Sequence, residues 1–130
     1  MSQEKSVLKY TLRYSEKLHS QKDFQQIIRS GRRLVHPALL IYAGNNGLPA
    51  GTRRLGLITS RKIGIAVRRN RLKRRFREIF RLNKYLIKLN TDLIFAPKPP
   101  AGDMNYAQLE SIILNLLEKA GLLYKVNGKS

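Results

Sequence analysis

Apolar residues recur along the chain with helical and strand-like spacings, and these spacings predict its elements. A short helix is predicted from Ser20 to Ser30, because apolar residues lie three and four positions apart on one side: Phe24, Ile27 and Ile28. Ser20 is a favourable N-cap, Asp23 follows at the capping-box position, and Gly31 is well suited to end the helix.

Extended segments follow this helix. Residues 33–43 are rich in strand-forming residues, and Pro37 within them predicts a bend or an edge position. Residues 44–51, GNNGLPAG, have the composition of a turn. Residues 53–60 predict a second strand, which we expect to pair with the first as a hairpin. Residues 91–98 predict a further strand, ended by three prolines: Pro97, Pro99 and Pro100.

Two longer helices complete the pattern. The first begins near Ala66 or Val67 and is expected to run to about Leu89, with a buried stripe of four residues: Leu72, Phe76, Ile79 and Phe80. The last begins at a capping box, Asn105 with Gln108, and ends before Gly121. Its core stripe is the clearest in the chain: Leu109, Ile112, Ile113, Leu116, Leu117 and Ala120. Helices and strands in this order predict an α+β domain with one small sheet.

Length and composition indicate one modest domain. The 130 residues, 42% of them hydrophobic, fit a domain over residues 20–125, preceded by a flexible basic arm, 1–19, and followed by a short tail, 126–130. The chain has no cysteine, which excludes disulfides and thiolate metal sites. No apolar run is long enough for a secretory signal or a membrane span, so we expect a soluble cytoplasmic protein.

Charge narrows the choice of partner. The formal net charge is +18, and the 54 residues between Asp23 and Glu78 contain fourteen basic residues and no acid. Such an excess favours a nucleic-acid partner first and an anionic membrane second. On the basic helix, the polar and charged side chains opposite the buried stripe are Asn70, Lys73, Arg74, Arg77 and Arg81. A face that merely contacts water mixes charges of both signs, whereas arginine grips phosphate through two hydrogen bonds.

Residues for protein-based catalysis are not apparent in the sequence. His19 and His36 are isolated, the eight acids are scattered, and there is no phosphate-binding glycine loop. We therefore expect neither a catalytic residue nor a metal ligand in the protein itself.

The basic segment also carries a family resemblance. Residues 61–78, RKIGIAVRRNRLKRRFRE, resemble the signature of the bacterial ribonuclease P protein component, with an Arg-Asn-Arg core followed by Lys-Arg and Arg-Glu on the same helix. Four further segments are similar to the first helix and three strands of that family: residues 20–33, 39–46, 54–64 and 91–101. The resemblance covers about residues 8–125. It implies the order α-β-β-β-α-β-α, similar to domain 2 of ribosomal protein S5, with a left-handed crossover.

The resemblance further implies a function. The family's protein is the accessory subunit of an RNA-catalysed endoribonuclease that removes the 5′ leader from precursor tRNA. Its partners are the catalytic RNA subunit, which binds Mg²⁺ and performs the hydrolysis, and the precursor tRNA. No cofactor is implied for the protein alone. The implied contacts with the RNA subunit are Arg69, Asn70, Arg71, Lys73, Arg74 and Arg77.

A second set of implied contacts lies in a cleft between the first helix and the sheet. Phe24 and Tyr42 match aromatic residues on which unpaired leader bases stack, and Lys62 and Lys98 are candidates for leader phosphates. Plain core packing is an equally good interpretation of Phe24. The chain departs from the family pattern near this cleft at three positions, which puts leader recognition in question: Ile28, Ile65 and Pro97.

Two other functions compete with this interpretation. A structural RNA-binding protein of the ribosomal type has the same composition and differs in having no role in cleavage. A DNA-binding protein could place the basic helix in a major groove, although the sequence has neither helix-turn-helix spacing nor a dimerisation heptad.

Overall fold

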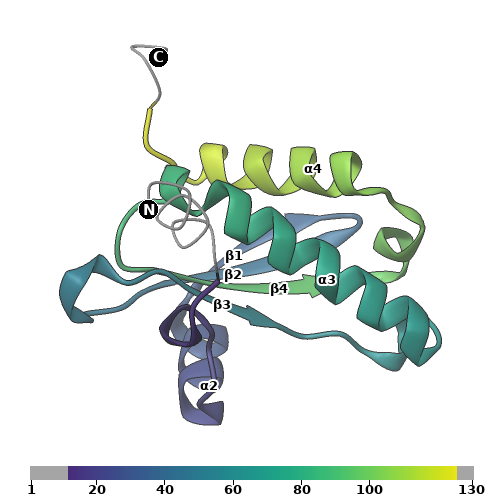
Figure 1. Cartoon of the computed structure of the whole chain (residues 1–130), viewed down its shortest axis with the longest axis horizontal. Helices are drawn as coiled ribbons and strands as arrows, with labels where there is room; N and C mark the ends of the chain where they lie inside the picture. The colour runs from purple at the N-terminus through teal and green to yellow at the C-terminus, as the bar shows by residue number, and fades with distance from the viewer. Residues whose placement is uncertain (1–11, 126–130) are drawn as a thin grey trace, which may run out of the picture.

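The computed structural model of the chain describes residues 12–125 and shows one four-stranded sheet with helices on both faces (Figure 1). Helices α3 and α4 cover one face, and α2 lies on the other. The helices are α2 (Gln21–Ser30), α3 (Ala66–Asn83) and α4 (Tyr106–Lys119). The strands are β1 (Arg32–His36), β2 (Leu39–Asn45), β3 (Arg54–Leu57) and β4 (Thr91–Pro97). The order α-β-β-β-α-β-α is therefore confirmed.

The sheet has the strand order β1-β2-β4-β3, which corrects the expected hairpin. β3 pairs in parallel with β4 and does not pair with β2. The hairpin lies instead within the first extended segment, where β1 and β2 are antiparallel and turn at Pro37. Proline favours such a turn, and the ring Nδ1 of His36 accepts a hydrogen bond from the Ala38 N–H at 3.0 Å. Because β3 and β4 are parallel neighbours, α3 forms the crossover between them.

Helix α2 begins and ends at the residues expected from the sequence. The Ser20 hydroxyl accepts a hydrogen bond from the Asp23 N–H at 3.4 Å, as an N-cap should. The Asp23 carboxylate accepts from Arg54 at 3.0 Å, a contact that ties the helix to β3. No residue larger than glycine fits at position 31, because a Cβ there would lie 2.4 Å from the Ile27 carbonyl oxygen and 2.7 Å from that of Ala43.

Helix α3 is shorter than expected. It ends at Asn83, and a 3₁₀ turn, η4 (Lys84–Leu86), follows where the sequence predicted a helix to about Leu89. The chain turns there because Lys84 is buried and Ile87 packs into the core. Helix α4 agrees with its prediction, since Asn105 and Gln108 exchange both capping-box hydrogen bonds, at 2.8 and 3.0 Å.

The core has two parts, one on each face of the sheet. The larger lies under α3 and α4 and includes the predicted stripe of α3 with Ile41, Leu93 and Phe95. The smaller lies under α2, where Leu18, Ile27 and Ile94 are buried and three partly buried residues pack against them: Phe24, Tyr42 and Ile58. The α2 face therefore holds both aromatic residues that the family resemblance singled out.

Residues 12–19 pack against the domain, although the sequence suggested a flexible arm up to residue 19. They form the 3₁₀ turn η1 (Tyr14–Glu16), and Leu18 donates its N–H to the Leu55 carbonyl oxygen at 2.9 Å, along the outer edge of β3. We call residues 12–19 the N-terminal strap. The first eleven residues of the expected arm and the expected tail, 126–130, lie outside the described residues.

Candidate nucleic-acid interface

One side of α3 is buried and the other is basic, as the sequence pattern predicted. Leu72, Phe76, Ile79 and Phe80 are the buried residues of the helix. Asn70, Arg71, Arg74 and Arg77 are exposed, and Lys73 is half-buried. The predicted set of RNA-facing side chains therefore lies outside the core.

Several basic side chains of α3 and its C-terminal end are already held by the protein. Arg68 forms an ion pair with Asp103 at 2.6 Å, Arg75 donates to the Met104 carbonyl oxygen, and Arg81 pairs with Glu78. The hydrogen bond with Glu78 raises the pKa of Arg81 above its usual value. The contacts of Arg68 and Arg75 tie α3 to the segment before α4, whereas the Arg81–Glu78 pair lies within the helix.

The remaining polar side chains form a set that we call the free basic face: Asn70, Arg71, Lys73, Arg74 and Arg77. None of the five has a side-chain hydrogen bond or an ion pair with any residue in 12–125. Like charges at this density repel one another and favour neutralisation by a polyanion. Arg69, predicted with this set, differs because its guanidinium donates to the Gly64 carbonyl oxygen at 2.9 Å.

The free basic face continues into a small pocket of about 220 Å³ beside the outer edge of β3. Lys73 and Arg77 contribute from α3, Phe24 from α2, and two basic residues from the N-terminal strap, Lys17 and His19. Lys17 and His19 were not among the binding residues predicted from the sequence. Their basic character was visible, but their position depends on the strap packing along β3, which no local pattern indicates.

The structure brings Phe24 and Tyr42 onto the same face of the sheet. Both are half-buried and pack against the smaller core cluster. The Phe24 ring lies against the backbone of β3, since a Cβ added to Gly56 would lie 2.5 Å from Phe24 Cζ. Phe24 therefore packs in the core and also lines the small pocket, so the two interpretations of this residue are compatible.

Lys62 and Lys98 follow the carboxyl ends of two neighbouring parallel strands. Lys62 is exposed in the 3₁₀ turn η3 (Arg61–Ile63), after β3. Lys98 comes directly after β4, and its ammonium donates to the His36 carbonyl oxygen at 2.9 Å. Because the carboxyl ends of parallel neighbouring strands lie at the same end of a sheet, both lysines follow the same end of this sheet.

The three departures from the family pattern have different surroundings. Ile28 is 37% exposed on α2, and Ile65 is 74% exposed just before α3. Pro97 is buried at the end of β4, opposite Leu39 of β2. A basic residue at position 97 would therefore need a different local packing.

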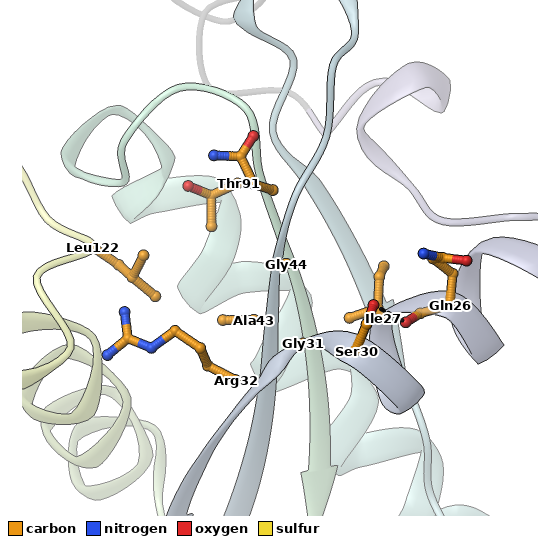
Figure 2. A pocket seen from close by; sticks show the side chains of 10 residues that line it. Gln26, Ile27, Ser30, Gly31, Arg32, Ala43, Gly44, Thr91 and Leu122 are labelled. Carbon is orange, nitrogen blue, oxygen red and sulfur yellow. Dashed lines mark hydrogen bonds between the residues drawn. The ribbon is translucent and has the colours of Figure 1, made fainter.

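A larger hollow of about 450 Å³ lies beside the C-terminal end of α2, where β2 extends beyond β1 (Figure 2). Arg32 is the only charged side chain among its lining residues, all of which are described, and its guanidinium donates to the Ala120 carbonyl oxygen at 2.8 Å. This hollow is less suited to a polyanion than the small pocket, where several basic side chains meet.

Metal-ligating residues do not gather within residues 12–125, where no group of three or more His, Asp or Glu side chains could hold a metal ion. No helix in the described part of the chain is long and apolar enough to cross a bilayer.

Comparisons with known proteins agree with the sequence resemblance. The family model described as ribonuclease P matches residues 12–121. The ribonuclease P protein component of Alkaliphilus metalliredigens is 35% identical over 109 residues, which are 84% of this chain and 96% of the relative.

Solved structures show the same fold. The RNase P protein of Staphylococcus aureus is 32% identical, with a TM-score of 0.75, and the match covers 84% of this chain and 98% of that protein. The RNase P protein of Thermotoga maritima is 33% identical, with a TM-score of 0.71 over 80% of this chain and 96% of its own.

Proposed function

The chain belongs to the ribonuclease P protein family, and we propose on this basis that it is the accessory subunit of a ribonucleoprotein that removes the 5′ leader from precursor tRNA. The catalytic RNA subunit binds Mg²⁺ and hydrolyses the phosphodiester bond. The protein supplies no catalytic side chain and no metal ligand of its own. Because precursor tRNA is the substrate, the compartment implied by this proposal is the cytoplasm.

The free basic face is the observation that supports this proposal most strongly. Arg71, Lys73, Arg74 and Arg77 carry four positive charges that no acid within residues 12–125 pairs with. In the proposed complex they contact phosphates of the RNA subunit, which releases counterions and gives binding a strong salt dependence. Asn70 lies among them and can hydrogen-bond a base edge or a ribose hydroxyl. Arg69 contributes beside them, from its position at the start of the helix.

The α2 face of the sheet is the proposed leader site. Tyr42 and Phe24 offer half-buried rings for stacking with unpaired bases, and each stacked base contributes ~1–3 kcal/mol in such sites. Lys62 and Lys98 provide positive charge at the sheet edge for the leader phosphates. By binding the leader, the protein makes the affinity of the holoenzyme for precursor tRNA higher than its affinity for mature tRNA, which has no leader.

Leader length provides a test of this proposal against a purely structural RNA-binding role. The holoenzyme, reconstituted from the RNA subunit and this protein, should bind precursors more tightly as the leader grows from none to several nucleotides. Tyr42→Ala should flatten this dependence, because it removes a stacking surface. Lys119→Ala, on an exposed part of α4, should leave it unchanged. Equal affinity of the wild-type holoenzyme for all leader lengths would reject the leader site.

A further inference from the structure

The small pocket at the edge of β3 joins residues of both proposed contact sets, Phe24, Lys73 and Arg77, to residues of the N-terminal strap that neither set includes. It lies between the free basic face of α3 and the α2 face of the sheet, and the N-terminal strap closes a third side. Its volume of about 220 Å³ is large enough for a nucleobase and too small for a folded nucleic-acid element. Ten residues line it: Leu12, Lys17, Leu18, His19, Phe24, Leu55, Gly56, Leu57, Lys73 and Arg77.

The floor of the pocket is apolar. Leu18 and Leu55 are buried there, and the Phe24 ring lies beside Gly56, whose missing side chain leaves the backbone of β3 accessible to that ring. Leu57 is partly buried along the same strand. An apolar floor with an aromatic ring is suited to the flat face of a base.

The edge of β3 offers hydrogen-bonding groups beside this floor. Ile58 donates its N–H toward β4, to the Phe95 carbonyl oxygen at 3.0 Å, whereas Leu55 accepts on the outer side from Leu18. By the alternation of backbone groups in a strand, Leu57 also faces outward. No backbone group within residues 12–125 pairs with Leu57 on that side. Its N–H and carbonyl can therefore bond the polar edge of a base.

The rim of the pocket is basic and has no acid. Lys73 and Arg77 lie one helical turn apart on α3, and Lys17 faces them from the strap. The three side chains have no hydrogen bond or ion pair within the described chain. His19 adds a polar ring, which stacks on Tyr14 with ring centres 3.8 Å apart. Positive charge without a counter-charge above an apolar floor complements a molecule with a flat base and an anionic phosphate.

We propose that this pocket is a nucleotide subsite, which binds one unpaired nucleotide with its base on the floor and its phosphate on Lys73, Arg77 and Lys17. The inference rests on the proposed function, because the nucleotide belongs to an RNA of the holoenzyme. It places the bound nucleotide between the surface for the RNA subunit and the surface for the leader.

The subsite is tested by titrating the full-length protein with uridine 5′-monophosphate and measuring the backbone amide chemical shifts by NMR. Saturable shifts are expected at Leu18, Gly56 and Leu57 and not at Gly44 or Asn45, which line the larger hollow. Uridine without phosphate should bind more weakly, and inorganic phosphate should not shift the floor residues. Absence of saturable shifts at the floor overturns the proposal, as does an equal response to inorganic phosphate, which would show a phosphate site only.

Two matched lysine variants distinguish specific binding in the pocket from non-specific attraction to a positively charged protein. Lys17→Ala should weaken binding of uridine 5′-monophosphate about tenfold, the size expected for one charged hydrogen bond. Lys22→Ala removes an exposed lysine of α2 that does not line the pocket, and it should leave the affinity unchanged. Equal losses in both variants would contradict a specific site.

Crosslinking in the assembled holoenzyme identifies which RNA supplies the nucleotide. One arm places 4-thiouridine in the leader and the other places it in the RNA subunit, and mass spectrometry locates the adducts. An adduct on residues 12–19 or 55–57 in either arm supports the subsite and identifies the RNA that supplies the nucleotide. The absence of such an adduct from both arms overturns the proposal. Since the NMR test needs neither RNA nor cleavage, the subsite can fail while the proposed function stands, and the reverse.

Discussion

The ammonium Nζ of Lys84 lies 3.0 Å from Oε1 of Glu16, and the lysine side chain is only 2% exposed. This ion pair joins the N-terminal strap to the turn that ends α3, 68 residues later in the chain. Breaking one partner of a buried ion pair is strongly destabilising, because charge-assisted hydrogen bonds are lost in a place that water barely reaches. The pair therefore fixes the strap, and with it one wall of the small pocket.

Glu16→Gln should lower the free energy of unfolding by about 3 kcal/mol, as expected for one broken partner of a buried ion pair. Urea denaturation measures the loss. Glu118→Gln, at an exposed position of α4, is the control and should change stability by less than about 0.5 kcal/mol. Similar midpoints for the wild type and the Glu16 variant would show that the pair does not stabilise the fold.

Gly31→Ala should destabilise the protein by about 1–3 kcal/mol, because the added Cβ meets two backbone carbonyl oxygens that cannot rotate away. The backbone φ of −78° at this residue is suitable for alanine, so the expected effect is one of space alone. Gly47→Ala provides the comparison, since no atom lies within 4 Å of its added Cβ. If both variants melt at the wild-type temperature, α2 does not pack on β2 as described.

Tyr106 gives a prediction for alkaline pH. Burial, helped by Glu110, whose carboxylate accepts from the phenol at 3.2 Å, raises the pKa of Tyr106 from 10.0 to about 12. A raised pKa in the folded state means that the contribution to stability is complete below pH 10 and is lost as pH rises through 12. The difference in unfolding free energy between the wild type and Tyr106→Phe should therefore be constant up to about pH 10 and fall above it. A difference that stays constant to pH 12 would refute the shift.

Local sequence patterns predicted the three helices and the extended segments between them, whereas the order α-β-β-β-α-β-α came from the family resemblance, because the local pattern gave β1 and β2 as one bent segment. Apolar spacing and caps located α2 and α4 to within a residue, because those signals lie within the helix itself: Ser20 for one, Asn105 and Gln108 for the other. Strand pairing was not predictable in the same way. The partner of β3 is β4, more than thirty residues later, and no pattern near Arg54 indicates a parallel neighbour at that distance.

The positions of the basic residues were predictable from local sequence, whereas their partners in the fold were not. Helical periodicity placed Lys73, Arg74 and Arg77 opposite the core, as observed. Periodicity could not show which arginines the protein itself holds, because the partners come from distant segments, such as Asp103 for Arg68. The buried position of Lys84 was missed for the same reason, since its partner lies in a strap expected to be flexible.

Arg74→Ala should weaken binding to the RNA subunit and reduce the slope of log affinity against log salt by about 0.7–0.9, the value for one lost phosphate contact. Lys119→Ala removes one positive charge at an exposed site on α4 and should leave the slope unchanged. Filter binding over a range of salt concentrations gives both slopes. An unchanged slope for Arg74→Ala would count against the free basic face as the contact surface.

Cleavage of a precursor tRNA at low Mg²⁺ tests the central claim most directly. The reaction compares the host RNA subunit alone, this protein alone, and the two together. We predict no cleavage by the protein alone, slow cleavage by the RNA subunit alone, and strong stimulation when both are present. Cleavage by the RNA subunit that is unchanged when the protein is added would contradict the proposed role and favour a structural RNA-binding protein.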